Sequence, residues 1–188
     1  MATVGMRDLY YALITEEEVD GKTKSTYGTP KRMAKAISAD LSVTVAEGKL
    51  HADDAVDAAE REFAGGTLTL GVNDLSDEVL SDLLGQEVDE DGTLYAGDDD
   101  VAPYVAVGFR CRKPGGEYKY IWLYKVKFGV PNENYATKGE SITFNTPTIT
   151  GDIMRRPDDG KWKTQHTGKP EDAVPAAWFT AVKEKTAG

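Results

Sequence analysis

Residues 65–85 read GGTLTLGVNDLSDEVLSDLLG, and this stretch decides the fold of the chain. In its first half, Leu and Val alternate with Thr and Gly, which is the period-two pattern of a strand with one buried face. In its second half, apolar residues recur three to five positions apart along one side of a short helix: Leu75, Val79, Leu80, Leu83 and Leu84. Asp74 or Ser76 can cap the start of this helix, and Gly85 suits the position after its end. A helix of about ten residues does not persist alone in water. We therefore predict that residues 74–84 form the main helix and lie against a sheet.

Most of the remaining chain has the pattern of strands, so the fold class that we predict is mainly β. The 188 residues fit one domain with a sizeable core, spanning 1–188. No apolar run approaches the ~20 residues that a membrane-spanning helix needs. The first residues lack the basic-then-apolar pattern of a secretory signal, and we expect synthesis and folding in the cytosol. The single cysteine, Cys111, excludes an internal disulfide.

Residues 104–111 and 117–128 are the clearest strands, and the turn sequence Pro114-Gly115-Gly116 between them predicts an antiparallel hairpin. In the first strand one predicted face holds Val105, Val107, Phe109 and Cys111. In the second strand one predicted face holds Tyr118, Tyr120, Trp122, Tyr124, Val126 and Phe128, and the other holds Lys119, Ile121, Leu123, Lys125 and Lys127. Such an aromatic row is typical of a core or a subunit interface.

The segment between the first strand, 9–15, and the main helix is less regular. Residues 16–35 are predicted to form a long polar loop, and loops of this length commonly bind something. Residues 41–46 and 50–52 flank Glu47-Gly48-Lys49, which is a hairpin signal. Residues 55–63 favour a helix by composition, but they are also suited to an exposed beginning of the strand that follows.

Three later segments also permit short predictions. Residues 86–100 form an acidic loop in which Asp89, Asp91 and Gly92 lack the register of an EF-hand. Residues 141–150 are predicted as a strand with a break at Pro147, which indicates an edge or a bulge. Residues 172–185 keep helical spacing, and a C-terminal helix is predicted there, with an extended tail as the alternative.

The charge of the chain is unevenly distributed. The net charge is −10. Residues 40–100 carry 18 acidic side chains against two basic ones, whereas residues 101–128 carry six basic side chains against one acidic. One interpretation is a solvated acidic surface; the other is a pair of complementary patches through which one copy docks on the next. Stable binding to nucleic acid is disfavoured, because the acidic excess repels phosphates.

The sequence contains none of the catalytic motifs that we considered. G-x-S-x-G, G-x-x-x-x-G-K-[ST], G-x-G-x-x-G and H-E-x-x-H are all absent. His51 and His166 are far apart in the chain, and Cys111 is predicted to be a small core residue. We expect no enzymatic activity, no cofactor and no bound metal.

An ordered series of segments resembles the major tail protein, or tail tube protein, of phages with long, non-contractile tails. The resemblance runs from about Thr3 to Val182. It rests on TVGMRDLYYALIT at 3–15, YGTP at 27–30, the opening stretch at 65–85, YKYIWLYKVKFGVPNENYATKGESITFNTPTITG at 118–151, and Trp178-Phe179. No single motif in this series is diagnostic; the order of the segments is the specific feature.

This resemblance implies a β-sandwich or half-barrel with one helix on its flank, similar to the tube protein of type VI secretion. It implies hexameric rings that stack into a hollow tube around a tape-measure protein, and the tube ends at terminator and tail-tip proteins. Double-stranded DNA later passes along the tube without specific binding. The expected location is the virion tail, with assembly in the host cytoplasm.

The resemblance also directs attention to the contacts between subunits. We expect the 16–35 loop to reach a neighbouring ring, and we expect Tyr27, Pro30, Lys31, Arg32 and Tyr135 at the interface. The alternatives are a tail terminator or completion protein that forms a single ring, and a β-sandwich module of the tail that binds carbohydrate or the host. A small hydrolase is the third alternative.

Overall fold

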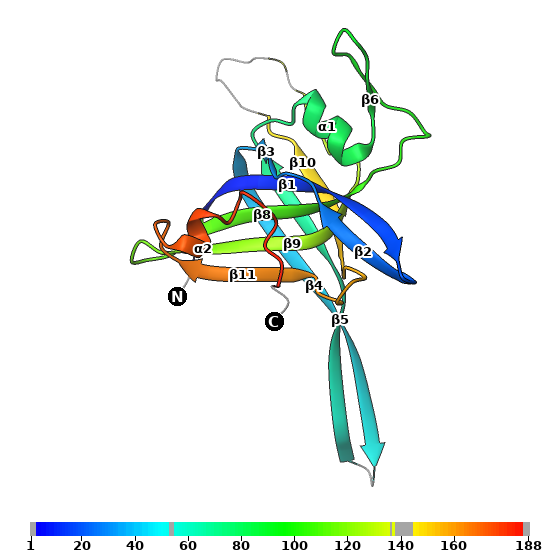
Figure 1. Cartoon of the computed structure of the whole chain (residues 1–188), viewed down its shortest axis with the longest axis vertical. Helices are drawn as coiled ribbons and strands as arrows, with labels where there is room; N and C mark the ends of the chain where they lie inside the picture. The colour runs from blue at the N-terminus through cyan, green and yellow to red at the C-terminus, as the bar shows by residue number, and fades with distance from the viewer. Residues whose placement is uncertain (1–2, 53–54, 136, 138–144, 186–188) are drawn as a thin grey trace.

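The computed structural model describes residues 3–52, 55–135, 137 and 145–185, and it has the mainly β fold that the sequence predicts (Figure 1). The strands are β1 (Val4–Val19), β2 (Lys22–Tyr27), β3 (Lys31–Ala34), β4 (Ala36–Ala52), β5 (Ala55–Val72), β6 (Glu87–Val88), β7 (Leu94–Tyr95), β8 (Tyr104–Arg112), β9 (Tyr118–Phe128), β10 (Thr148–Met154) and β11 (Lys163–Gly168). The helices in these residues are α1 (Asp77–Leu84) and α2 (Ala173–Ala176).

Nine of the strands form one antiparallel sheet that curls but does not close into a barrel. Its order is β2-β1-β8-β9-β10-β5-β4, with β3 also paired to β1 and β11 also paired to β9. Only Lys35 separates β3, which pairs with β1, from β4, which pairs with β5. Lys35 and Asn73 exchange hydrogen bonds at this corner, through N–H groups that donate over 2.8 and 3.0 Å. The two halves of the sheet therefore approach each other at one end and diverge at the other.

The first core lies inside this curl and is covered at one end by α1. It contains Leu9, Tyr11, Met33, Leu68, Leu70, Val72, Leu75, Val79, Leu80, Leu83, Leu84, Val105, Val107, Phe109, Ile121, Leu123, Val126, Phe128, Ile149 and Ile153. The predicted main helix is confirmed, with Ser76 at its N-cap and Gly85 in the left-handed conformation after its end. Its four buried side chains supply the apolar stripe, so the opening stretch joins strand and helix in one core.

A second core lies on the outer face of β1, β8 and β9. It contains Ala12, Ala106, Tyr120, Trp122, Tyr124, Trp178 and Val182. The indole of Trp122 lies over Gly108, where an added Cβ would come within 2.7 Å of the ring. Trp122 Nε1 donates to the carbonyl of Trp178 over 3.0 Å, and Tyr124 Oη donates to that of Lys183 over 2.7 Å. The β8–β9 hairpin is thus buried on both sides, and the C-terminal segment is the outer cover (Figure 1).

The predicted alternation of side chains along β9 is wrong after Tyr124, because the pairing of β8 with β9 contains a bulge. Val105 pairs with Val126 and Val107 pairs with Leu123, so Ala106 lies opposite two residues of β9. An extra residue reverses which side chains face each way. Val126 and Phe128 therefore join Ile121 and Leu123 in the first core rather than sharing a face with Trp122. The predicted hairpin and the face of β8 that holds Val105 and Phe109 are confirmed.

The prediction of a long polar loop at 16–35 is wrong. β1 continues to Val19, turns back at Asp20 and Gly21, and pairs with β2, after which β3 returns to β1. Asp20 and Gly21 have φ values of 52° and 71°, as in the tight turn that an Asp-Gly pair favours. Many residues of this hairpin are charged because much of it faces solvent. Their polar composition is typical of a loop, so it led to the wrong prediction.

The hairpin predicted around Glu47-Gly48-Lys49 is also wrong. β4 runs through these residues without turning, and its partner is β5 along its whole length. Residues 55–63 belong to β5, so the interpretation as the beginning of that strand is confirmed and the helix is wrong. Alanine and acidic residues favour a helix in isolation, but pairing with β4 overrides that weak preference.

The two remaining predictions are only partly met. The C-terminal helix at 172–185 is wrong beyond α2, because Trp178 and Val182 spread over the second core in an irregular path. The alternative of an extended tail is not met either, because residues 177–180 form turns. β10 begins directly after Pro147 and lies between β9 and β5, not at an edge. Residues 141–144 of the predicted 141–150 strand lie outside the described residues.

Candidate functional site

The most prominent surface feature is the free edge of β4. Within the described residues, β4 pairs only with β5, so the backbone groups along its other side have no sheet partner. Ile37, Val43 and Val45 are large apolar residues on this strand, and 57%, 40% and 46% of their surfaces are exposed. A long, exposed edge that carries apolar side chains is a template for pairing with another chain.

The outer halves of β4 and β5 form an arm that leaves the body (Figure 1). We define the arm as the ribbon from the Thr44–Gly65 pair to the Ala52–Ala55 pair. β10 pairs with β5 only as far as Gly66, so no third strand of the described residues pairs with the arm. At about 3.3 Å per residue, Thr44–Ala52 extends about 30 Å. Every side chain from Ser42 to Gly48 is exposed, and an isolated two-stranded ribbon is marginally stable at best in water.

Two other exposed stretches of the sheet, in β1 and β2, are protected by features of the chain itself. β1 has irregular register at Gly5 and Asp8, where φ is 69° and 57°, and bulges of this kind discourage edge pairing. The outer side of β2 is covered at Ser25, whose backbone N–H and hydroxyl both donate to the carboxylate of Asp158, over 2.9 and 2.8 Å. The β4 edge carries no comparable cover among the described residues.

Four of the predicted interface residues lie near one another in the chain, but they are not equally available. Tyr27 packs beside Tyr124 with ring centroids 6.2 Å apart, and burial raises its pKa to about 12. Pro30 is half-buried at the start of β3. The ammonium of Lys31 lies 2.8 Å from Asp82 and 3.2 Å from Glu78 on α1. Arg32 is exposed and lies 3.4 Å from Asp8. Lys31 is therefore engaged within the subunit, while Arg32 remains largely accessible.

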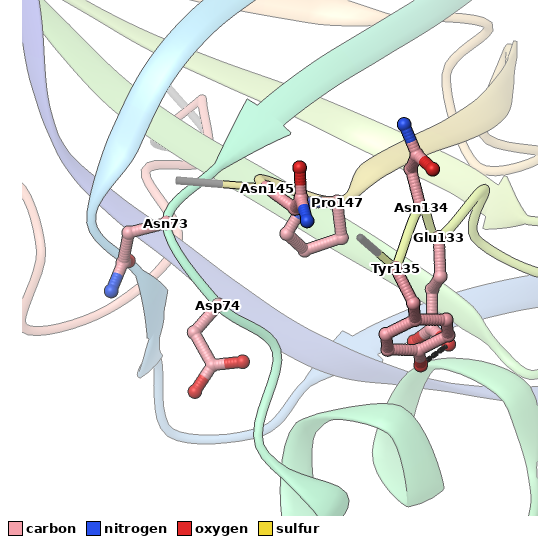
Figure 2. Close-up of a pocket in the computed structure, with 7 residues that line it drawn as sticks. All are labelled: Asn73, Asp74, Glu133, Asn134, Tyr135, Asn145 and Pro147. Carbon is pink, nitrogen blue, oxygen red and sulfur yellow. Dashed lines mark hydrogen bonds between the residues drawn. The ribbon is translucent and has the colours of Figure 1, made fainter. Parts of the chain in front are cut away.

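Tyr135, the fifth predicted interface residue, lines a polar hollow of about 220 Å³ beside α1 (Figure 2). The hollow is lined by Asn73, Asp74, Glu133, Asn134, Tyr135, Asn145 and Pro147. The hydroxyl of Tyr135 donates to the Glu133 carboxylate, and 84% of the residue is exposed. Lys31 lines a different hollow, with Tyr11 and Leu13. The side chains that line the Tyr135 hollow are mostly amides and carboxylates.

The charges are segregated toward opposite ends of β8. Residues 74–100, which precede β8, contain eleven acidic residues and no Lys or Arg. Lys31 neutralises part of this end through Glu78 and Asp82. Arg112 and Lys113 follow at the other end of β8, and exposed Arg7 belongs to the β1 strand that pairs there. The subunit therefore presents an acidic end and a basic end that differ in sign.

The titratable groups that could suggest catalysis have structural explanations. His166 stacks against Trp178, with ring centroids 6.0 Å apart. Burial raises the pKa of the Cys111 thiol. The carboxylate of Asp89 accepts hydrogen bonds from the backbone N–H groups of Thr93 and Asp91 and from the Tyr95 hydroxyl, which lowers its pKa. In the described part of the chain, no group of three or more His, Cys, Asp or Glu residues could hold a metal ion.

Sequence reasoning missed the β4 edge and the arm as a candidate surface. The signal that could have found them is the length over which 36–52 and 55–72 can pair. No helix in the described residues is both long enough and apolar enough to cross a membrane. The chain matches no protein-family model, and no curated protein matches it.

Proposed function

We propose that this chain is a structural subunit that polymerises, namely the tail tube protein of a long, non-contractile phage tail. Its copies form hexameric rings, and the rings stack into a hollow tube. A tape-measure protein occupies the tube during assembly, and double-stranded DNA passes along it later. Terminator and tail-tip proteins are the partners at its two ends. The chain acts by shape in this proposal and transforms no molecule.

The β4 strand is the observation that carries the proposal. It combines a long free edge, exposed apolar side chains and an arm in which residues 42–48 of β4 are all exposed. In a protein that stays monomeric, such an edge is an aggregation hazard and is usually blunted, as β1 and β2 are here. Pairing with the sheet of a neighbouring copy would satisfy the backbone groups of β4. Repeating that pairing around an axis would turn curled, open sheets into one wide closed barrel.

The charge segregation supports contacts between unlike surfaces. A heterologous contact repeats along an axis only when each copy offers two different faces, and the acidic 74–100 end and the basic Arg112 end differ in this way. Charge complementarity of this kind mainly sets approach and specificity. A tube for DNA must also let the duplex slide, and an overall acidic subunit holds phosphates poorly.

Negative-stain microscopy of the purified full chain tests the proposal. Long hollow tubes or stacked rings are the expected result, and raising the salt concentration should slow their growth because it screens exposed charges. Single rings that never stack would favour a terminator or completion protein. A chain that remains monomeric at high concentration contradicts the proposal. Glycan binding by that monomer would indicate a binding module, and ester or glycoside turnover would indicate a hydrolase.

The structure changes which part of the chain should be removed to test assembly. Deleting 16–35, as the sequence first suggested, would remove buried Ser25 and Met33 and would damage the body. Of residues 46–48 and 60–62, the part of this segment whose burial the structure describes, none belongs to the first or second core. The arm therefore offers the cleaner deletion.

A further inference from the structure

A cluster of contacts lies where the arm meets the body. Phe63 of β5 stacks on Trp162, with ring centroids 4.5 Å apart and an interplanar angle of 6°. The guanidinium of Arg155 lies 5.8 Å from the centroid of the Phe63 ring and donates to the Phe63 carbonyl. The same group lies 3.5 Å from Glu62. These contacts come from the segment between β10 and β11, which is distant in sequence from the arm.

The body side of this cluster is held firmly. The carbonyl of Trp162 accepts a hydrogen bond from the backbone N–H of Tyr124 in β9 over 2.9 Å. Arg156 is buried and its guanidinium lies 2.7 Å from both Asp159 and Glu184. The backbone of Trp162 is thus hydrogen-bonded to the central strand β9, and the neighbouring Lys161 carbonyl accepts from the backbone N–H of Arg156 over 3.0 Å.

The arm side has the features of a bend. Thr44 pairs with Gly65 and Val45 pairs with Phe63, so Ala64 is an extra residue in β5. A bulge bends its strand and increases the local twist. The next two residues are Gly65 and Gly66, and pairing with β10 ends at Gly66. A Cβ at Gly66 would come within 2.7 Å of the Ser42 carbonyl, so this close approach requires glycine. An open hollow of about 380 Å³, lined by Thr44, Gly65 and Asp152 among others, lies at the same place.

We infer that the arm turns as a unit about the bulge at Ala64 and that the Phe63–Trp162 stack holds it in the direction seen. The bend lies where the third strand ends, so the ribbon beyond it is restrained only by its own pairing and by this cluster. A stacked aromatic pair that is partly exposed shifts the equilibrium between the observed arm direction and other directions by a small factor. Loss of the stack should lower the population of the observed direction roughly two- to tenfold.

We call the bulge at Ala64 together with the Phe63–Trp162 stack the joint of the arm. The inference about the joint does not depend on the proposed function, but the effect of the joint on assembly rests on it. If copies assemble through the arm, the direction of the arm sets which part of the next copy it reaches. A subunit with a loose joint must then order the arm when it binds, which lowers affinity without removing any contact surface.

Distances between two spin labels test the inference on the full-length chain. One label is placed on the arm at Ala46→Cys and the other in the turn after β8 at Glu117→Cys, in a Cys111→Ala background, and both sites are exposed. Pulsed electron resonance is recorded on the monomeric fraction from gel filtration. The parent protein should give a narrow distance distribution, and Phe63→Ala should broaden it. Phe63→Tyr should restore the narrow distribution, because it keeps the stacked ring.

Phe179→Ala is the matched control. Phe179 stacks on Tyr10 with centroids 4.7 Å apart and is half-buried like Phe63, but it lies on the second core away from the arm. Its removal should leave the distance distribution unchanged. The inference is overturned if Phe63→Ala leaves the distribution narrow, if Phe179→Ala broadens it equally, or if the parent distribution is already broad. These results concern single subunits, so they are separable from failure to form tubes.

Discussion

The β8–β9 hairpin and the arm are both antiparallel two-stranded ribbons, yet they have opposite environments. β8 and β9 are covered on one side by the first core and on the other by the C-terminal segment. Beyond the Phe63–Trp162 stack, the arm residues whose burial the structure describes, 46–48 and 60–62, are all exposed and include Ala46, Glu47 and Arg61. Burial supplies most of the free energy that holds a ribbon in one conformation. The difference teaches that the β8–β9 hairpin stabilises the subunit through burial on both faces, whereas the described residues 46–48 and 60–62 of the arm add little burial to it.

Removing the arm is the change with the largest expected effect. Residues 46–62 are replaced by a two-residue Asn-Gly turn, which joins Val45 to Phe63 where they already pair. We expect complete loss of long assemblies in negative stain, because the free β4 edge is shortened and its partner contact is gone. The free energy of unfolding of the body should change by less than about 1 kcal/mol, since surface changes away from cores have small effects. Tubes of normal length from this variant would show that the arm does not mediate assembly.

Trp122→Ala should have the largest effect on stability. The indole is fully buried, packs over Gly108 and donates to the Trp178 carbonyl. Large-to-small changes of an aromatic core residue cost about 3–5 kcal/mol. Chemical denaturation followed by fluorescence or circular dichroism would measure the loss. A cost below about 1 kcal/mol would mean that the second core is dispensable and that the contrast between hairpin and arm is weaker than the burial indicates.

Asp159→Asn tests the polar network that holds the Trp162 side of the joint. Asp159 accepts from Arg156 through two nitrogens, at 2.7 and 2.8 Å, and from the Lys161 ammonium at 2.6 Å. Hydrogen bonds to charged groups contribute about 1.5–3 kcal/mol, and we expect a loss of this size at pH 7.

The pH dependence of that loss has a defined sign. Hydrogen bonds from Arg156 and Lys161 lower the pKa of Asp159 well below its ordinary value of 3.8. The unfolded chain therefore binds this proton more readily, so the stabilisation is present above about pH 4 and disappears as the pH falls toward the folded-state pKa. The difference between the parent protein and Asp159→Asn in free energy of unfolding should shrink between pH 5 and pH 2.5, as denaturation series would record. A constant difference across that range would exclude the carboxylate as its source.

The contrast between the two ribbons also explains which features the sequence could predict. The 74–84 helix was predictable because its caps, its apolar stripe and its glycine stop are all local. The face of β8 was predictable because Val105, Val107 and Phe109 alternate in the sequence with small or charged residues. The reversal in β9 was not, because the bulge opposite Ala106 depends on how two strands meet. The arm was missed for a related reason: pairing over a long distance, rather than any local pattern, makes residues 55–63 a strand.

Of the candidate site, the sequence placed Arg32 on an accessible surface but did not foresee the internal roles of Tyr27 and Lys31. Their chemical types suit contacts between subunits as well as contacts within one. Asp20-Gly21 was the overlooked local signal, since an Asp-Gly pair between two runs of alternating residues marks a hairpin turn. The free edge of β4 had no counterpart in composition, because an unpaired backbone leaves no trace in the side chains.

Val45→Thr should have the smallest effect on the free energy of unfolding. Together with its control in β8, it compares burial in the arm directly with burial in the β8–β9 hairpin. Thr has nearly the shape of Val, so the substitution mainly adds a hydroxyl. At Val45, which is 46% exposed, water can satisfy that hydroxyl, and we expect a change within about 0.5 kcal/mol in free energy of unfolding. The matched control is Val107→Thr in β8, where the side chain is fully buried in the first core and a hydroxyl without a partner costs about 1–3 kcal/mol. Denaturation of the two variants under the same conditions measures both values.

If the arm also lies against a neighbouring copy, Val45→Thr should slow tube growth while leaving the subunit as stable as before, because an interface that buries Val45 would then bury the hydroxyl. Equal costs at both positions in the isolated subunit would mean that the arm packs on the body in solution, contrary to the arrangement described here.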